Sequence, residues 1–525
     1  MERRKEDTIF TQSSLIASLV KPEAYSHPVS SIEVFETHIS WVILTGSFAY
    51  KIKKAVQLDF LDFGSLERRL HFCQEELRLN RQWAPELYLA VVPICGSTEH
   101  PLVGGEGDAI EYAVKMVQFS QSAQLDNQLT AGLLHEKDVY GLAETIAGYH
   151  GRAKIIEYAN DRESVGKVTA PMLDNFAPLK QTIDMDLLTR VQQWTVDSLR
   201  DLKPKLIQRR KEGFVRECHG DLHLANLVRL SNGIVAFDCV EFSAELRNID
   251  VMSDIAFLVM DLVARARQDL GYACLNRYLE CTGDYSGLDV FGLYFVYHCM
   301  IRAKVAAIRS TERTKAEDRE QDIAEVKHNL AVAARWIEAR RHWLISMHGY
   351  SGSGKTWVSS LLLSQLPAIR VRSDIERKRL AGLNETANSD SKPGAGIYTA
   401  RARGNVYAIL IEIAEGLLEA GFNVIIDASF LGQADRKLPA ALAGRQGVSF
   451  AFVSTSADEA ELLRRLQERG KSSKGASEAD VSVLKYQFRH SEPLNAGERK
   501  KTVFVGTDKI VDAGRIIKSL KRIRG

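Results

Sequence analysis

Residues 218–242, CHGDLHLANLVRLSNGIVAFDCVEF, decide the fold expected for the first part of the chain. Asn226 follows Asp221 closely, and a Ser-Asn-Gly turn then leads into an apolar strand that ends at Asp238. Because a hairpin returns the chain to where it began, the three polar side chains are expected to meet. Phosphoryl transfer from a nucleotide needs a carboxylate that receives the acceptor's proton, and oxygen ligands that hold Mg²⁺ on the phosphates. Asp221 suits the first role, and Asn226 and Asp238 suit the second.

The spacing of Asp221 and Asn226 equals that of the catalytic loop H-R-D-x-x-x-x-N of protein kinases. The motif H-G-D-L-H-x-x-N, followed by a strand ending in Asp238, resembles the aminoglycoside phosphotransferase and choline kinase group, distant relatives of protein kinases. The resemblance covers roughly the first three-fifths of the chain. It implies a bilobal kinase fold that uses ATP to phosphorylate a hydroxyl, and an aspartate at the position of Asp254 that braces the catalytic loop.

A lysine on an early strand is the next part that a kinase-like fold requires. The strand FAYKIK alternates so that Lys51 and Lys53 share one face, where such folds place a lysine for the nucleotide phosphates. We prefer Lys51, which follows two apolar residues, and keep Lys53 as the alternative. The helix expected over residues 65–83 carries Glu75 and Glu76, either of which can pair with that lysine. Our choice between them is Glu76.

Two further features of the expected small lobe concern the nucleotide. Gly46 is the only glycine in the hairpins before the lysine strand, where a protein kinase has a glycine-rich loop over the phosphates. This departure leaves the phosphate clamp of the small lobe without its usual residues. The strand expected over residues 110–119 leads toward the second lobe. The resemblance implies that backbone groups near its end, from Met116 to Phe119, receive the adenine.

Length and composition limit the classes of protein that the chain can belong to. A chain of 525 residues is too long for one core, and we expect a small lobe at 1–120, a large lobe at 121–340 and a further domain at 341–525. A net charge of +2 gives no strong electrostatic case for binding bulk nucleic acid, and local basic patches stay open as an alternative. Seven scattered cysteines predict reduced thiols in a cytoplasmic protein. The chain shows no apolar leader and no run of about eighteen apolar residues, so no membrane segment is expected.

Residues 349–356, GYSGSGKT, match the phosphate-binding loop G-x-x-x-x-G-K-[ST]. An apolar strand precedes the match and a helix follows it, which is the context that this loop requires. Lys355 is expected to reach the β- and γ-phosphates of ATP, and the hydroxyl of Thr356 to bind Mg²⁺. Backbone N–H groups and the helix N-terminus supply the rest of the cradle. The expected nucleotide-binding residues are Gly349, Tyr350, Ser351, Gly352, Ser353, Gly354, Lys355 and Thr356.

The segments after this loop alternate between strands and helices, which predicts an open parallel sheet with its active groups at the strand ends. Three motifs there, S-D-x-x-R at 373–377, I-I-D-A-S-F at 425–430 and R-L-x-x-R at 465–469, resemble the P-loop kinase domain of polynucleotide kinases and gluconate kinase. The resemblance covers about the last third of the chain. The expected fold is therefore a bilobal protein-kinase-like fold, of mixed α/β and α+β class, followed by a P-loop domain.

The second resemblance also implies roles for single residues. Asp374 is expected to be the general base on the acceptor hydroxyl, and Asp427 to support Mg²⁺. The arginines that the resemblance places at the acceptor and at the transferring phosphoryl group are Arg377, Arg465 and Arg469. The alternative for Asp374 is a helix N-cap, and for the arginines a solvated helix face.

Two hypotheses about function remain open. The first is a two-headed kinase in which both halves use ATP and Mg²⁺ to phosphorylate hydroxyl acceptors, either small molecules or nucleic-acid ends. The second is a regulatory ATP-binding protein in which one half is a non-catalytic sensor or scaffold. An ATPase coupled to a partner is a third option that no further motif supports. Because no Gly/Ser/Pro-rich linker separates the halves, we expect them to dock on each other.

Overall fold

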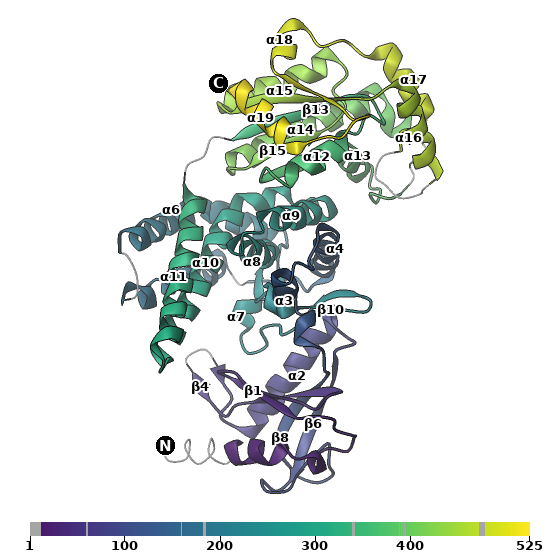
Figure 1. Ribbon diagram of the computed structural model, residues 1–525. Coiled ribbons are helices and arrows are strands. Elements are labelled where there is room, and N and C mark those ends of the chain that lie inside the picture. The colour runs from purple at the N-terminus through teal and green to yellow at the C-terminus, as the bar shows by residue number, and fades with distance from the viewer. Residues whose placement is uncertain are drawn as a thin grey trace. The chain divides into compact units, whose positions relative to one another are not determined.

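The computed structural model describes residues 12–58, 61–158, 160–181, 185–338, 342–387, 389, 391, 395–471 and 478–524. Contacts within the chain divide it into two compact units. The first consists of Met1–Val168 and Ile207–Leu258, and the second of Thr169–Leu206 and Val259–Gly525. Figure 1 labels the elements of both units along the chain.

The first unit is built on an antiparallel sheet of six strands in the order β1-β2-β3-β8-β6-β7. Alternation along these strands sends one set of side chains to an apolar cluster around Ile43 and Ile52, and the other to a cluster around Ala49 and Val114. A short hairpin of β4 and β5 follows the lysine strand. The strands are β1 (Glu33–Glu36), β2 (Ser40–Leu44), β3 (Phe48–Lys53), β4 (Gln57–Leu58), β5 (Leu61–Asp62), β6 (Tyr88–Gly96), β7 (Pro101–Val103) and β8 (Ala109–Val117).

Helix α2 (Leu66–Trp83) packs on β6 and β8, and Figure 1 shows it alongside the sheet. Ser65 caps the helix, because its hydroxyl accepts a hydrogen bond from the N–H of Arg68. Its buried residues include Cys73, Glu76 and Leu79, which lie three positions apart on one face. The face that α2 turns to the sheet therefore carries a buried carboxylate.

The hairpin that follows Asp221 is formed by β10 (Leu227–Leu230) and β11 (Gly233–Ala236), which pair in antiparallel register after the single turn η4 (Leu224–Asn226). Strands β9 (Val215–Glu217) and β12 (Asn248–Asp250), which flank the hairpin in the sequence, pair with each other in antiparallel register. The hairpin thus has the form that the sequence predicts, whereas the pairing of β9 with β12 was not foreseen. The helices between residues 125 and 264 are α3 (Leu125–Thr130), α4 (Glu136–Arg152), α5 (Asp161–Asp174), α6 (Met185–Lys211), α7 (Ala244–Arg247) and α8 (Val251–Ala264). Of these, α5, α6 and α8 have residues in both units.

The second unit contains a parallel sheet of five strands in the order β14-β15-β13-β16-β17, which confirms the expected open sheet. Strand β13 lies at its centre, and the chain later places β15 and β16 on opposite sides of it. Such a switch of direction opens a crevice at the carboxyl end of the central strand. The strands are β13 (Trp343–His348), β14 (Ala368–Arg372), β15 (Asn423–Asp427), β16 (Ser449–Ser456) and β17 (Thr502–Gly506).

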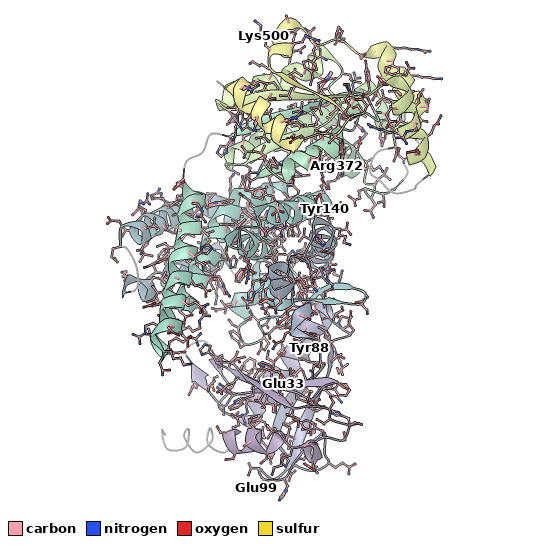
Figure 2. All side chains as sticks on the ribbon, in the orientation of Figure 1. Glu33, Tyr88, Glu99, Tyr140, Arg372 and Lys500 are labelled. Carbon is pink, nitrogen blue, oxygen red and sulfur yellow. The ribbon has the colours of Figure 1, made fainter. Side chains whose placement is uncertain are left out.

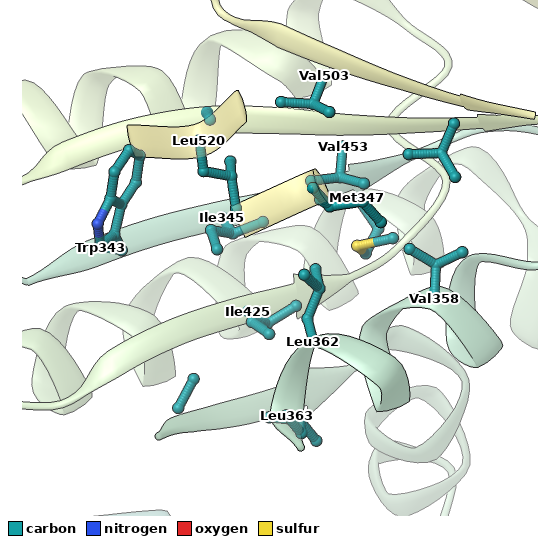
Figure 3. Packing of buried hydrophobic residues seen from close by; sticks show 14 residues of the cluster. Trp343, Ile345, Met347, Val358, Leu362, Leu363, Ile425, Val453, Val503 and Leu520 are labelled. Atoms are coloured by element: carbon teal, nitrogen blue, oxygen red, sulfur yellow. The ribbon is translucent and has the colours of Figure 1, made fainter. Parts of the chain in front are cut away.

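An apolar core joins this sheet to its helices. Figure 3 shows Ile345 and Met347 of β13 packed with Val358 and Leu362 of α12, and with Leu520 of α19. The core positions the start of α12, where the phosphate-binding loop ends. The helices of the P-loop domain are α12 (Lys355–Leu363), α13 (Ser373–Leu380), α14 (Ala400–Glu419), α15 (Gln433–Gln446), α16 (Glu459–Lys471), α17 (Val481–His490), α18 (Ala496–Lys500) and α19 (Ala513–Arg524).

Three further helices belong wholly to the second unit, namely α9 (Gln268–Thr282), α10 (Leu288–Glu312) and α11 (Ala316–Ile337). Phe291, Tyr294 and His298 on α10 are buried, so that these side chains belong to the core. Within the described residues, one stretch, Tyr285–Glu312, is long and apolar enough to cross a membrane. Since 61% of its apolar window is buried inside the structure, it also has the character of a core helix.

Candidate functional site

The loop that carries Asp221 is fixed by a buried carboxylate. The backbone N–H groups of His219 and Gly220 donate to Asp254, at 2.9 and 3.0 Å. Asp254 lies in the first turn of α8 and is 1% exposed. Gly220 has a φ of 86°, and a Cβ added there would lie 2.8 Å from the carbonyl oxygen of Leu246. The structure thus shows Asp254 bracing the loop, as the resemblance implied.

Asp221 and Asn226 are in direct contact. The Nδ2 of Asn226 donates to Oδ2 of Asp221 at 2.9 Å and to its carbonyl oxygen at 3.0 Å. The amide nitrogen is therefore committed, and Oδ1 is the atom that Asn226 can offer to a metal ion. The side chain of Asp221 is 40% exposed, and His223 Nε2 lies 3.3 Å from its Oδ2. Asp221 is accessible to an acceptor and held in orientation.

Asp238 follows β11 and is tied to this loop. Phe237 donates its N–H to the carbonyl oxygen of Asn226 at 3.0 Å, and His219 Nε2 lies 2.9 Å from the carbonyl oxygen of Phe237. The φ of Asp238 is 63°, a left-handed conformation that costs free energy at non-glycine residues and clusters at functional sites. Its N–H donates to the hydroxyl of Tyr88, labelled in Figure 2, at 3.1 Å. The structure therefore brings together the three polar residues that the sequence predicts as one site.

Both candidate lysines face Glu76. The Nζ of Lys51 lies 2.9 Å from Oε1 of Glu76, and the Nζ of Lys53 lies 2.8 Å from Oε2. Lys51 also pairs with Asp238, whereas Lys53 pairs with Glu241. The side chain of Lys53 is 0% exposed and that of Lys51 is 12% exposed. Lys51 is therefore the lysine that pairs with Asp238, the expected metal ligand, and that is partly exposed to solvent.

Burial and charge act in opposite directions on these groups. Burial lowers the pKa of Lys51, but Asp238 and Glu76 reverse this and raise it well above its ordinary value. Burial raises the pKa of Glu76, yet Lys51 and Lys53 hold it below its ordinary value. At Glu241 burial prevails over Lys53, and the pKa is raised. Sequence reasoning found Glu76 but missed Glu241, whose only signal is its position three residues after Asp238.

Two residues of the small lobe are expected near the nucleotide: Met116 near the adenine, and Gly46 in the turn over the phosphates. Met116 is 6% exposed and packs in the apolar cluster with Leu87 and Tyr88. Gly46 lies in the turn between β2 and β3 with a φ of 92°, and its N–H donates to Oε1 of Gln118 at 2.8 Å. The contact of Met116 or its neighbours with adenine stays a prediction.

The phosphate-binding loop joins β13 to α12. A Cβ at Gly349, which has a φ of 142°, would lie 2.5 Å from the carbonyl oxygen of Thr455. Gly352 and Gly354 also have left-handed φ values, 84° and 87°. The Nζ of Lys355 donates to the carbonyl oxygens of Gly349 and Tyr350, at 3.1 and 2.9 Å. The ammonium group is thus held across the loop whose N–H groups are expected to cradle phosphate.

Helix α17 contacts the same loop. The N–H of Ser351 donates to Oε1 of Gln487 at 2.8 Å, and Nε2 of Gln487 donates to the Ser351 hydroxyl at 3.0 Å. The hydroxyls of Tyr350 and Ser491 lie 2.8 Å apart, and the ring of Phe488 meets that of Tyr350 edge-on. No motif marks Gln487, and sequence reasoning missed it.

Asp427 ends β15 beside the first turns of α12. It is 5% exposed, and its Oδ2 lies 3.2 Å from the hydroxyl of Ser359. That hydroxyl also lies 3.0 Å from the carbonyl oxygen of Thr356. Hydroxyl and carboxylate oxygens are hard ligands of the kind that Mg²⁺ prefers. Thr356 with Asp427 therefore fits the ion, as do the oxygens of Asn226 and Asp238 in the first unit.

Asp374 and Arg377 share the first turns of α13. The N-cap of this helix is Arg372, and Asp374 lies inside the first turn, so the N-cap alternative for Asp374 is wrong. The Nη1 of Arg377 donates to Oδ1 of Asp374 at 3.0 Å, and its guanidinium lies 5.0 Å from the ring centroid of Tyr398. The hydroxyl of Tyr398 in turn lies 3.4 Å from Oε2 of Glu478. A carboxylate and a cation thus stand together in the first turns of α13.

Of the two arginines of α16 expected at the transferring phosphoryl group, the structure describes the side chain of Arg465. Arg465 donates to the carbonyl oxygen of Gly352 at 3.2 Å and to the hydroxyl of Thr507 at 2.9 Å. Its interpretation as a purely solvated residue is wrong, since its guanidinium supports the phosphate-binding loop. The side chain of Arg469 lies outside the part of the chain that the structure describes.

These features define the class of protein. The first unit has the antiparallel sheet, lysine–glutamate pair and catalytic hairpin of a protein-kinase-like fold, and the chain ends in a P-loop domain with an open parallel sheet. A family model described as an AAA domain matches residues 344–494. The chain is 30% identical over 416 residues to an uncharacterized protein of Mycobacterium tuberculosis, covering 77% of this chain and 80% of that protein. An uncharacterized protein of Mycobacterium bovis matches with the same values. The chain belongs to the family of these mycobacterial proteins.

Solved structures resemble separate portions of the chain. Choline kinase from Cryptosporidium parvum is 12% identical, with 58% of this chain and 90% of that chain covered and a TM-score of 0.37. A gluconokinase from Sinorhizobium meliloti is 20% identical, with 35% of this chain and 95% of that chain covered and a TM-score of 0.25.

Proposed function

We propose that the protein is an ATP-dependent phosphotransferase with two nucleotide sites, which transfers the γ-phosphate to hydroxyl acceptors. The acceptors are small molecules, nucleic-acid ends or both. The observation that carries the proposal is the contact of Asp221 with Asn226, in a loop tied to Asp238 and beside the Lys51–Glu76 pair. These are the parts that phosphoryl transfer needs, and they come from segments far apart in the sequence.

At the first site, Asp221 receives the proton of the acceptor hydroxyl as its oxygen bonds to the γ-phosphorus. The bond from that phosphorus to the β–γ bridging oxygen breaks, and ADP leaves with the bonding electrons. Lys51 pairs with the phosphates, and Glu76 holds Lys51 in place. The oxygens of Asn226 and Asp238 would hold Mg²⁺, which when bound neutralises charge on the β- and γ-phosphates.

At the second site the same transfer uses different parts. The N–H groups of residues 349–356 and the ammonium of Lys355 bind the phosphates, and Thr356 with Asp427 would hold Mg²⁺. Asp374 receives the acceptor's proton, and Arg377 next to it favours an acceptor that carries negative charge. A phosphorylated sugar and a nucleic-acid end both have that chemistry.

We also propose that the protein works in the cytoplasm, because its seven cysteines are present as thiols and none is joined in a disulfide. Neither membrane nor bulk nucleic acid has a part in the proposed reaction.

A regulatory role for the first unit is the second candidate, and one observation favours it. The turn between β2 and β3 carries only Gly46, whose N–H is bonded to Gln118 instead of being directed at a phosphate. A site of this kind binds ATP as a sensor and gives no transfer.

The two candidates are separated by a labelling experiment on the full chain. The protein is incubated with Mg²⁺, ATP labelled in the γ-phosphate, and a panel of sugars, amino alcohols, nucleosides and 5′-hydroxyl oligonucleotides. Variants Asp221→Asn and Asp374→Asn are assayed in parallel. We expect at least one labelled acceptor for each site, lost in one variant and kept in the other. Labelling that Asp374→Asn abolishes and Asp221→Asn never changes, over the whole panel, favours the sensor. Labelling that survives in both variants contradicts the proposed roles.

A further inference from the structure

Helix α9 lies outside the sequence motifs of the P-loop domain but contributes side chains to its sheet. Strand β14 is at the edge of the five-stranded sheet, so one row of its backbone groups has no neighbouring strand. Asn276 of α9 meets that row, since its Nδ2 donates to the carbonyl oxygen of Ala368 at 2.9 Å. Its Oδ1 accepts from the N–H of Arg370 at 2.7 Å. Asn276 is 1% exposed, so these bonds are made in the interior.

A buried ion pair follows one turn further along α9. The Nη2 of Arg370 lies 2.8 Å from Oε1 of Glu280, and their side chains are 3% and 2% exposed. The other oxygen of Glu280 lies 3.4 Å from Nη1 of Arg372, which Figure 2 labels. Taking one member of a buried pair away leaves a charge without compensation, which is strongly unfavourable. Within this unit, Arg370 is thus held in place by a carboxylate that the P-loop motifs do not include.

Arg370 connects the ion pair to the phosphate-binding helix. Its Nη1 donates to the hydroxyl of Ser360 at 2.8 Å and lies 3.3 Å from the hydroxyl of Ser359. The hydroxyl of Ser359 lies 3.2 Å from Oδ2 of Asp427. An unbroken chain of polar contacts therefore runs from Glu280 to the carboxylate at the end of β15.

The end of α9 also approaches the helix that carries Asp374. Gly283 caps α9 with a φ of 74°, and a Cβ there would lie 2.8 Å from Nε of Arg379 on α13. Any other residue at this position would move Arg379 as well as strain the backbone. The helix with the proposed base and the strand before it thus both rest on α9.

We propose that Glu280 is a positioning residue of the P-loop site, which acts through Arg370 and Ser359 to orient Asp427 toward the Mg²⁺ of bound ATP. The proposal rests on the proposed role of Asp427. Groups that orient a metal ligand from outside the ligand set commonly change metal affinity about 10–100-fold when they are removed. The N–H cradle and Lys355 bind phosphate without this chain of contacts, so binding of metal-free nucleotide does not depend on it.

The test measures how far Mg²⁺ strengthens nucleotide binding. Calorimetry with a non-hydrolysable ATP analogue is run on the full chain in EDTA and over a series of Mg²⁺ concentrations. All variants carry Lys51→Met and Asp238→Ala, which take the phosphate lysine and a metal ligand away from the first site. Glu280→Gln should raise the Mg²⁺ concentration at half effect at least about tenfold, while the dissociation constant in EDTA changes less than about twofold. An unchanged Mg²⁺ response in Glu280→Gln overturns the proposal.

Two further variants separate positioning from folding. Glu280→Gln with Arg370→Met removes the buried charge that Glu280→Gln leaves on Arg370, so the thermal midpoint should largely recover while the Mg²⁺ response stays weak. This double variant carries the test if Glu280→Gln alone does not fold. Asp322→Asn breaks a partly exposed ion pair with Arg309, 2.6 Å between α10 and α11 and outside this chain of contacts, and should lower the midpoint without changing the Mg²⁺ response. Recovery of both quantities in the double variant, or an equal Mg²⁺ effect in Asp322→Asn, shows a purely structural role and overturns the proposal.

Asp427→Asn separates failure of this inference from failure of the proposed function. If Asp427→Asn leaves the Mg²⁺ response intact, the role of Asp427 itself is wrong, and the inference is wrong with it. If Asp427→Asn weakens the response and Glu280→Gln does not, only the inference is wrong.

Discussion

Asp221, the base that we propose for the first site, has immediate neighbours that hold it in place. Its carboxylate is partly exposed, it accepts a hydrogen bond from Asn226, and the loop around it is held by Asp254. Asp238 has a different environment, a left-handed backbone and an ion pair with Lys51. The two carboxylates therefore differ in environment, which supports the different roles that we propose for them.

We predict that Asp221→Asn lowers transfer to the first-site acceptor by roughly 10²–10⁴-fold, since it removes a general base and keeps the shape. Binding of Mg·ATP should be nearly unchanged, because the metal ligands remain. Asp238→Asn is the matched variant and should weaken Mg·ATP binding itself. Calorimetry and the labelling assay measure the two quantities. Loss of nucleotide binding in Asp221→Asn with normal binding in Asp238→Asn would show that the roles are reversed.

Substitutions of Lys51 and Lys53 should also have different effects, the first on ATP binding and the second on the free energy of unfolding. Lys51→Met is expected to weaken ATP binding at the first site, while Glu76 keeps Lys53 as its partner. Lys53→Met leaves Glu76 and Glu241 buried with a single lysine between them, and should lower the free energy of unfolding by roughly 3–5 kcal/mol. Urea unfolding and calorimetry on both variants measure these effects. The opposite pattern would make Lys53 the nucleotide lysine.

His348, at the end of β13, provides a prediction about pH. Burial, with the positive charges of Arg436 and Lys355, lowers its pKa to about 4 from the ordinary value of 6.5. The unfolded chain therefore binds a proton between these values that the folded chain does not. The stability that His348 contributes is present above about pH 6.5 and is lost as the pH falls toward 4.

In urea unfolding, the wild type should lose about 2 kcal/mol more than His348→Asn between about pH 7.5 and about pH 5. Asparagine at this position keeps a polar group near the Ser454 hydroxyl, which lies 2.9 Å from Nδ1 of His348. Equal losses in the two proteins would mean that His348 is not the titrating group.

Single residues show how far the sequence predicts the sites. Asp221, Asn226 and Asp238 were found because their spacing along a hairpin is local information. The choice of Glu76 over Glu75 follows in the structure from helix register, since Glu76 is buried and Glu75 pairs with Arg78 at the surface. Glu241, Ser359 and Gln487 carry no pattern of their own. Their positions depend on tertiary neighbours that a single sequence does not reveal.

At the scale of elements, α2 shows why hydrophobic periodicity is an incomplete guide. Its buried face includes Arg69, Glu76 and Asn80 among the apolar residues. Asn80 accepts from the N–H of Cys239 at 2.9 Å and thereby ties the helix to the segment after Asp238. Period-based reasoning located the helix correctly, but it passed over the polar residues that position the site. Strand β17 and helix α5 were not foreseen at all.

The contact of helix α17 with the phosphate-binding loop leads to a prediction about amide exchange in that loop. Gln487 occupies the N–H of Ser351, one of the amides of the phosphate-binding loop. Since such a hydrogen bond contributes about 1 kcal/mol, Gln487→Ala should speed amide exchange over residues 349–354 roughly fivefold in the absence of nucleotide. Addition of the ATP analogue should restore protection. Hydrogen exchange followed by mass spectrometry measures this, and the exposed Gln193→Ala on α6 is a suitable control. Unchanged exchange in Gln487→Ala would mean that α17 does not hold the loop.

At the scale of the whole molecule, the two sites that we propose hold nucleotide phosphates in different ways. The first uses a lysine–glutamate pair on an antiparallel sheet, and the second a helix N-terminus at the end of a parallel strand. The sequence predicts both fold classes correctly because each is marked by a motif in its required context. The three expected segments, 1–120, 121–340 and 341–525, and the docking of the halves stay predictions. Motifs mark sites, whereas domain limits depend on contacts such as those of α9 with β14.

The central claim, two nucleotide sites in one chain, is tested most directly by the stoichiometry of binding. Calorimetry with a non-hydrolysable ATP analogue and Mg²⁺ should find two sites per chain in the intact protein. Lys355→Ala should leave the first site, Asp238→Ala should leave the second, and the double variant should bind at neither. One site in the intact protein, abolished by Lys355→Ala and unaffected by Asp238→Ala, would contradict the claim.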